Sequence, residues 1–135
     1  MMEFVQQNIF LVVLALTSGG LLVWELLKGG GNGISTAEAT LKINREDALV
    51  VDVREANEWA AGHIANARHI VLGQLEKRLH EIEKFKERPV IVCCASGMRS
   101  AGACKQLQKA GFNQVFNLNG GITAWGEANL PLTTK

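Results

Sequence analysis

The chain has 135 residues, and its 14 lysine and arginine residues nearly balance its 13 aspartate and glutamate residues. This length suits one domain with a single hydrophobic core. A nucleic-acid-binding protein gathers its basic residues on one face, whereas here they alternate with glutamates, so we expect no nucleic-acid partner.

A strongly apolar segment lies near the N-terminus, with no charged residue from Ile9 to Trp24. A bilayer core takes about 20 apolar residues, with a lower limit near 17. The run reaches this length if it continues through Leu27 with Glu25 at the interface, where Trp24 also fits. A cleavable signal peptide would begin with basic residues and end in small ones, which this segment does not. We therefore expect residues 1–28 to form one transmembrane anchor.

The charges that flank this segment predict its orientation. No lysine or arginine precedes it, whereas Lys28, Lys42 and Arg45 follow it. Basic residues favour the cytoplasmic side. We expect a single-pass protein of the inner or plasma membrane, with its catalytic domain facing the cytoplasm. The glycine-rich residues 29–33 predict a flexible linker, and residues 34–135 the soluble domain.

Strand-like and helix-like patterns alternate along the soluble domain. Ser35 and Glu38 form a capping-box pattern at the start of the first helix. The expected strands are 49–53, 69–71, 90–94 and 115–118, and the expected helices are 35–43, 56–61, 72–82, 99–110 and one from 121 onward. Alternation of this kind predicts an α/β domain with a mostly parallel sheet and helices on both faces. Ligands of such sheets bind beyond the carboxyl ends of the strands.

One such strand end carries a candidate nucleophile, Cys94. It is followed by a short loop and the start of a helix, in the order Ala95, Ser96, Gly97, Met98, Arg99, Ser100. Inward-facing loop N–H groups, the helix N-terminus and the Arg99 guanidinium would all favour the thiolate. We therefore expect an activated thiol at the mouth of the loop rather than in the core, with a pKa below that of a free cysteine. Gly97 permits backbone conformations that other residues avoid.

The other two cysteines, Cys93 and Cys104, are interpreted as small buried hydrophobic residues. The odd cysteine count argues against a disulfide framework, and adjacent cysteines bridge only with strain. The sequence has no C-x-x-C pair and no Cys/His cluster at zinc spacing, so we expect no metal and no cofactor. Unbridged thiols are typical of a reducing compartment.

Four motifs in order along residues 33–131 resemble the rhodanese family. They are V-D-V-R-E at 51–55, E-W-x-x-G-H-I-A-N-A at 58–67, C-A-S-G-M-R-S at 94–100 and L-N-G-G-I-x-x-W at 118–125. The resemblance implies a rhodanese-like fold and sulfur transfer. A sulfane sulfur would move from a small donor such as thiosulfate onto the loop cysteine, and then to a thiol or cyanide.

The same resemblance implies roles for individual residues. By position, Cys94 would be the nucleophile and the N–H groups of residues 95–100 would hold the persulfide. Arg99 would stabilise its charge or position an anionic donor, and Asp52 and Arg54 would brace the site. The alternative for these two, and for Glu58 and His63, is structural ion pairing and turn formation.

One departure from the family pattern and two alternative functions bear on the function. Ala95 stands where the family often has arginine or another polar residue, and the smaller positive charge would weaken binding of dianionic thiosulfate. Four residues separate Cys94 from Arg99, whereas related phosphatases have five, so the loop favours sulfur over a phosphate ester. The second hypothesis is a membrane-tethered interaction module with little catalysis. Either protein could have a membrane-protein partner that the sequence does not identify.

Overall fold

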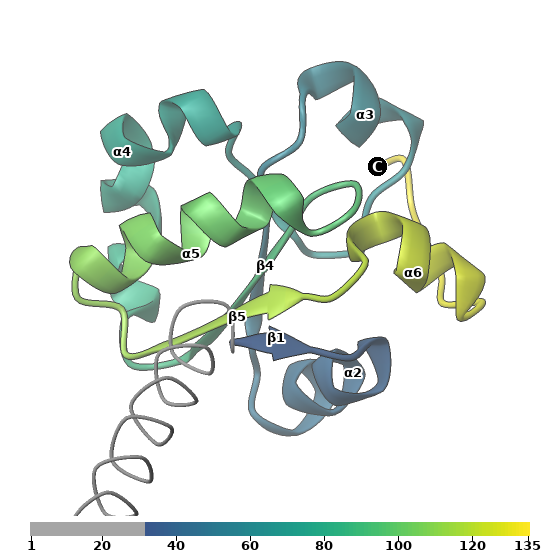
Figure 1. Ribbon diagram of the computed structural model, residues 1–135, viewed down its shortest axis with the longest axis horizontal. Coiled ribbons are helices and arrows are strands. Elements are labelled where there is room, and N and C mark those ends of the chain that lie inside the picture. The colour runs from purple at the N-terminus through teal and green to yellow at the C-terminus, as the bar shows by residue number, and fades with distance from the viewer. Residues whose placement is uncertain (1–31) are drawn as a thin grey trace, which may run out of the picture. The chain divides into compact units, whose positions relative to one another are not determined.

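The computed structural model describes residues 32–135 (Figure 1). The predicted anchor, residues 1–28, and the linker up to residue 31 lie outside the described residues. Within residues 32–135, no helix combines the length and the apolar character that crossing a membrane requires. Gly33, the last residue of the expected linker, belongs to a short strand, β1.

Five parallel strands form one sheet in the order β1-β5-β4-β2-β3. Their bounds are β1 Gly33–Ile34, β2 Leu49–Asp52, β3 Arg68–His69, β4 Pro89–Cys93 and β5 Gln114–Leu118. The prediction of a parallel sheet is confirmed, although β1 was not expected. β4 is central and buried at every residue, which accounts for its continuous apolar sequence.

The helices are α2 Thr36–Arg45, α3 Ala56–Ala61, α4 Leu75–Arg78, α5 Met98–Lys109 and α6 Gly121–Glu127, with 3₁₀ turns η1 Leu72–Gln74 and η2 Leu79–Phe85. The predicted capping box at Ser35 and Glu38 is present. The single helix expected over 72–82 is wrong. Leu79, Ile82 and Phe85 recur every three residues, which is the repeat of a 3₁₀ helix, and two of them are buried.

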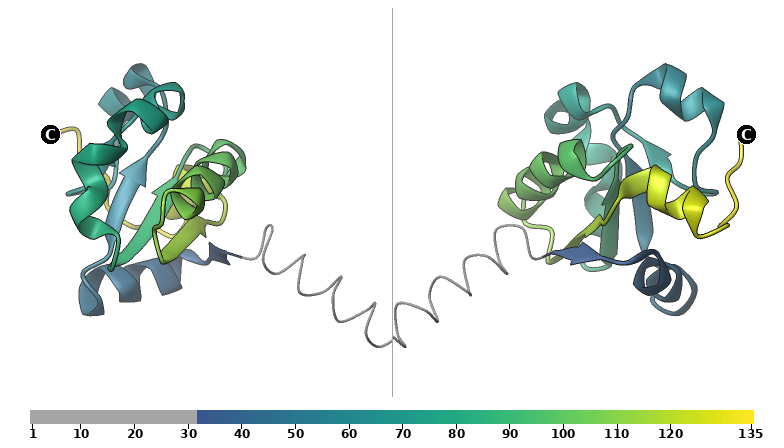
Figure 2. Two further views of the ribbon diagram at one scale, coloured as in Figure 1. Left: turned by 90° about the vertical axis from the view of Figure 1, so that its left-hand side faces the viewer. Right: turned by 45° about the vertical axis from the view of Figure 1, so that its right-hand side comes forward.

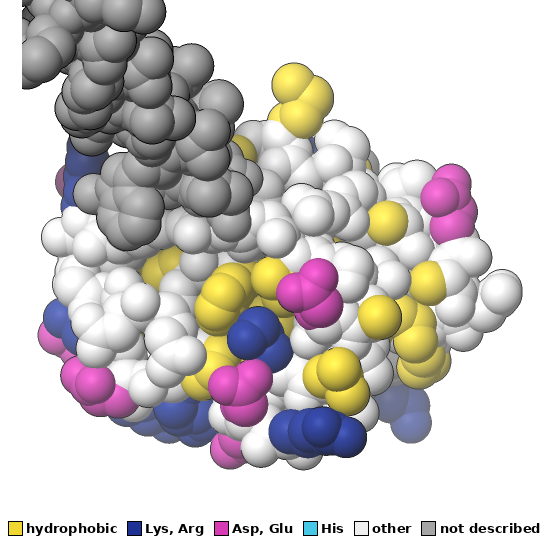
Figure 3. All heavy atoms as spheres, turned by 60° about the horizontal axis from the view of Figure 1, so that its bottom comes forward, with side chains coloured by type: hydrophobic (Ala, Val, Ile, Leu, Met, Phe, Trp, Pro, Cys, Tyr) yellow, Lys and Arg dark blue, Asp and Glu magenta, His cyan; other side chains and the backbone are white. Residues whose placement is uncertain are grey.

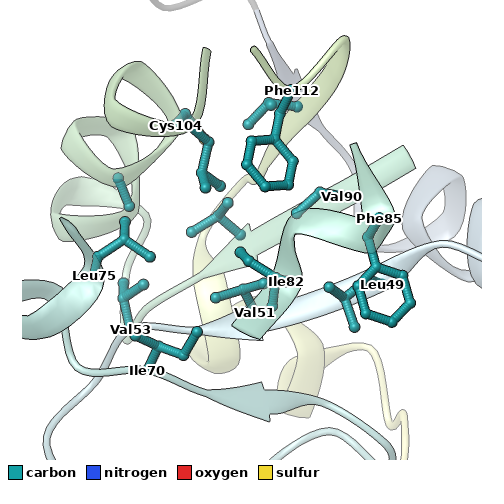
Figure 4. Packing of buried hydrophobic residues seen from close by; sticks show 14 of the residues in the cluster. Leu49, Val51, Val53, Ile70, Leu75, Ile82, Phe85, Val90, Cys104 and Phe112 are labelled. Carbon is teal, nitrogen blue, oxygen red and sulfur yellow. The ribbon is translucent and has the colours of Figure 1, made fainter. Parts of the chain in front are cut away.

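Helices cover both faces of the sheet, as Figure 2 shows from two sides. Alternate residues of β4 point to opposite faces, so Val92 packs with Leu107 of α5, and Ile91 packs with Trp125 of α6. Figure 4 shows the cluster on the α5 face, where Cys104 lies among the apolar side chains. The two-sided packing confirms the predicted layers.

The carboxyl ends of the central strands meet at one edge of the sheet. Asp52, the last residue of β2, lies opposite Cys93 in the β4 register, and Cys94 follows directly. On the face shown in Figure 3, basic and acidic side chains lie interspersed.

Candidate active site

The sulfur of Cys94 lies under a loop that turns its backbone toward it. The N–H of Gly97 donates to Cys94 Sγ at 3.0 Å, and Ser100 Oγ lies 3.4 Å from the same sulfur. Gly97 is the N-cap of α5 and has a φ of +98°, a conformation that glycine adopts readily. The loop therefore forms the anion-binding arrangement that the sequence predicted.

The pKa of Cys94 is set by opposing effects. Burial of the thiol raises its pKa, but hydrogen bonds from the Ser100 hydroxyl and from the N–H groups of Ser100, Ser96 and Gly97 lower it, and the net pKa is below its ordinary value. The direction agrees with the sequence prediction. The expected place at a loop mouth outside the core is wrong, because Cys94 is fully buried and belongs to the apolar cluster on the α5 face. Activation thus comes from hydrogen bonds made beneath the loop rather than from an open site.

The charges of Arg99 and the Cys94 thiolate interact, as the sequence predicts, since Cys94 helps to raise the pKa of Arg99; the structure adds a carboxylate partner. The Arg99 guanidinium forms two hydrogen bonds of 2.8 Å to the carboxylate of Glu58, which lies on α3. This pairing lowers the pKa of Glu58 to about 2, chiefly through the hydrogen bonds from Arg99. The partner lies 41 residues away in the sequence, so no local pattern could identify it.

Asp52 and Arg54 form a buried ion pair beside the loop. Arg54 Nε lies 3.0 Å from both carboxylate oxygens of Asp52, and Arg54 Nη2 donates to the carbonyl of Gly62 at 2.6 Å. The pair joins the end of β2 to the end of α3. His63 stacks on Trp59, with ring centroids 3.5 Å apart. These contacts fit the bracing and structural roles considered from the sequence.

One residue that the sequence argument missed also contacts the loop. Asn117 of β5 donates from Nδ2 to the carbonyl of Gly97 at 3.0 Å and accepts from Ser100 Oγ at 2.5 Å. It lies opposite Val92 of β4, next to the strand end that carries Cys94. Asn117 is the one polar residue of the strand expected over 115–118, and this was the signal available in the sequence.

The start of α6 supports the loop from the other side. The N–H of Ile122 donates to the carbonyl of Cys94 at 2.9 Å, and the N–H of Thr123 donates to that of Ala95 at 3.1 Å. Gly121 has a φ of +56°, and a side chain there would overlap the carbonyl oxygen of Cys94. The paired glycines of the last motif thus allow α6 to approach the loop closely.

The remaining cysteines lie in apolar surroundings. Cys93 points to the opposite face of the sheet, and its burial raises its pKa well above the ordinary value. Burial also raises the pKa of Cys104 to about 12. Neither thiol has the hydrogen bonds that favour the thiolate of Cys94. In the described part of the chain, no three metal-binding side chains gather into a possible metal site.

Comparisons with known proteins place this fold and loop in a family. The Rhodanese-like domain family matches residues 35–128. The chain belongs to the rhodanese family. This assignment covers the whole described fold apart from its two ends, including the Cys94 loop, and it confirms the resemblance seen in the four motifs.

Individual relatives agree with the rhodanese assignment. The protein YibN of Escherichia coli, described as uncharacterized, is 43% identical over 100 residues, which cover 73% of this chain and 70% of that protein. The thiosulfate sulfurtransferase GlpE of Pseudoalteromonas translucida is 34% identical over 95 residues, covering 70% of this chain and 89% of that one. A crystal structure of a rhodanese-related protein from Thermoplasma volcanium matches with a TM-score of 0.67 and 33% identity, covering 76% and 98% of the two chains.

Proposed function

We propose that this rhodanese is a sulfurtransferase that carries a sulfane sulfur as a persulfide on Cys94. The observation that supports this most directly is the loop geometry. The sulfur receives the Gly97 N–H at 3.0 Å, and its pKa is lowered in spite of burial. A buried thiol without such donors would have a raised pKa, as Cys104 does.

In the proposed reaction, the Cys94 thiolate attacks the outer sulfur of thiosulfate or of a persulfide. The S–S bond of the donor breaks, and its electron pair leaves with sulfite or with a thiolate. A thiol, as its thiolate, or cyanide then attacks the outer sulfur of the Cys94 persulfide, and the Cys94 thiolate leaves. The N–H groups of the loop would stabilise the negative sulfur at both stages. This chemistry requires neither a metal nor a cofactor.

We also propose that residues 1–28 anchor the protein in the inner or plasma membrane, with the rhodanese domain in the cytoplasm. The support is the uncharged run from Ile9 to Trp24 and the basic residues that follow it. Protease added outside spheroplasts should leave the domain intact. Its digestion there, or recovery of a soluble form that begins near Gly29, would contradict this placement.

Persulfide formation can be tested by mass. The full-length protein is incubated with thiosulfate or cysteine persulfide, and its intact mass and peptide masses are measured. We expect the mass of one added sulfur, located on the peptide that contains Cys94 and lost on reduction. Protein that gains no sulfur from either donor would favour the interaction module instead.

A further inference from the structure

The two guanidinium groups of the candidate site already have carboxylate partners. Arg99 binds Glu58 through two hydrogen bonds of 2.8 Å, and Arg54 binds Asp52 within the buried pair. Glu55 is a further acidic residue close enough to Arg99 to raise its pKa. The charges of the two pairs cancel, so Glu55 and the Cys94 thiolate leave an excess of negative charge.

This charge distribution matters because sulfur donors differ in charge. Thiosulfate is a dianion, and the sulfite that leaves it is a dianion as well. An organic persulfide is neutral or carries a single charge on its sulfur, and it leaves as a thiolate that can take up a proton. A site whose cations are already paired therefore penalises thiosulfate more than a persulfide.

The rim of the loop points to the same class of donor. The four residues between Cys94 and Arg99 carry no charge. One of them, Met98, is 83% exposed, which makes it the most exposed of the large hydrophobic side chains in the described region. An exposed methionine offers a flexible apolar contact to the carbon skeleton of an organic donor and nothing to a small inorganic anion.

We propose that Glu58 sets the donor selectivity of this site, disfavouring thiosulfate and favouring organic persulfides by holding the Arg99 guanidinium. The inference rests on the proposed sulfurtransferase function. To bind through Arg99, thiosulfate must displace the Glu58 carboxylate, whereas a persulfide donor does not need that contact. Glu58 is thus a specificity-determining residue that acts through Arg99.

Glu58→Gln tests this role with little disturbance of the local structure. The amide oxygen can still accept the N–H of Glu55, which the carboxylate accepts at 3.1 Å, so the start of α3 keeps its cap. Second-order rate constants for sulfur uptake by the full-length protein are measured with thiosulfate and with cysteine persulfide. We expect wild type to prefer the persulfide. In Glu58→Gln, the thiosulfate rate constant should rise about five-fold and the persulfide one should change by less than about two-fold.

Glu81→Gln provides the matched control. It removes the carboxylate of another bidentate pair, in which Arg78 donates to Glu81 at 2.6 and 2.9 Å, and it should leave both rate constants unchanged. If Glu58→Gln does not fold, as judged by circular dichroism, Glu58→Asp decides the question. Its shorter side chain loosens the two-bond contact with Arg99 and should raise the thiosulfate rate selectively, and an unchanged donor ratio would overturn the proposal.

The outcomes separate this inference from the function on which it rests. Loading of Cys94 by the persulfide, with a donor ratio that Glu58→Gln leaves unchanged, would overturn the role of Glu58 and leave the sulfurtransferase intact. A wild-type preference for thiosulfate would overturn it too. The absence of sulfur uptake from both donors would contradict both proposals.

Discussion

Ser100→Ala should raise the pKa of Cys94 and slow sulfur uptake. Ser100 is fully buried in the first turn of α5, with its Oγ 3.4 Å from Cys94 Sγ and 2.5 Å from Asn117 Oδ1. A carbonyl only accepts, so the Asn117 amide nitrogen must face the Gly97 carbonyl and its oxygen must face Ser100. The single hydroxyl proton therefore has two competing acceptors.

The size of the effect follows from this competition. A hydrogen bond to a charged group contributes about 1.5–3 kcal/mol, and a neutral one about 1 kcal/mol. When Cys94 ionises, the Ser100 proton turns from Asn117 to the sulfur, so the net gain is the difference, about 1 kcal/mol. Because a factor of ten in an equilibrium corresponds to about 1.4 kcal/mol, Ser100→Ala should raise the Cys94 pKa and lower the ratio of thiolate to thiol about five-fold at a given pH.

The assay is the pH dependence of iodoacetamide alkylation at Cys94, read by peptide mass. The control is a double variant that combines Glu58→Gln with Arg99→Gln. It removes both charges of the neighbouring ion pair and so leaves the net charge of the site unchanged. That variant should change the ratio of thiolate to thiol by less than about three-fold, because the two opposite charges largely cancel. An unchanged pKa in Ser100→Ala, or a larger shift in the control, would refute the hydrogen-bond account of activation.

Three further predictions concern the supports of the site and the core. Gly121→Ala should disrupt the Cys94 loop and abolish sulfur uptake. Gly126→Ala lies in open space on the same helix and should stabilise the protein to thermal unfolding by about 0.5–1 kcal/mol. Glu58→Gln should cost about 1 kcal/mol in urea unfolding at pH 7, after discounting for solvent screening. The pKa of Glu58 is about 2 in the folded protein and 4.5 ordinarily, so the stabilisation that Glu58 provides is complete above pH 4.5. The difference in unfolding free energy between wild type and variant should shrink as the pH falls toward 2. A difference that stays constant with pH would contradict this prediction. Leu107→Ala should cost about 2–5 kcal/mol by creating a cavity in the core, while exposed Leu41→Ala should change stability by less than about 0.5 kcal/mol, and equal losses would contradict the packing described.

The sequence predicted the layers well because the apolar runs are local signals. The runs that form β2 and β4 are buried on both faces, and α3 has the expected bounds. β1 was missed because two residues carry no periodicity. The sequence pattern did not show that the helix expected over 72–82 is interrupted by 3₁₀ turns. Apolar residues spaced three apart and four apart are nearly equivalent over one helical turn.

At the site, local reasoning identified the loop and missed its long-range partners. The capping geometry of Gly97 and the donors to Cys94 lie within six residues of the sulfur, so they could be predicted. The pairing of Arg99 with Glu58 and the contact of Asn117 with Ser100 depend on how α3 and β5 pack beside the loop. Only the assembled fold shows these partners.

The central claim is that sulfur passes through Cys94, and cyanide-dependent thiocyanate formation by the full-length protein tests it most directly. The comparison is between Cys94→Ser and Cys104→Ser, with cysteine persulfide as the donor. We predict that Cys94→Ser loses all turnover and that Cys104→Ser keeps it, because the burial that raises the Cys104 pKa to about 12 leaves that thiol unreactive. Turnover retained in Cys94→Ser would contradict the account.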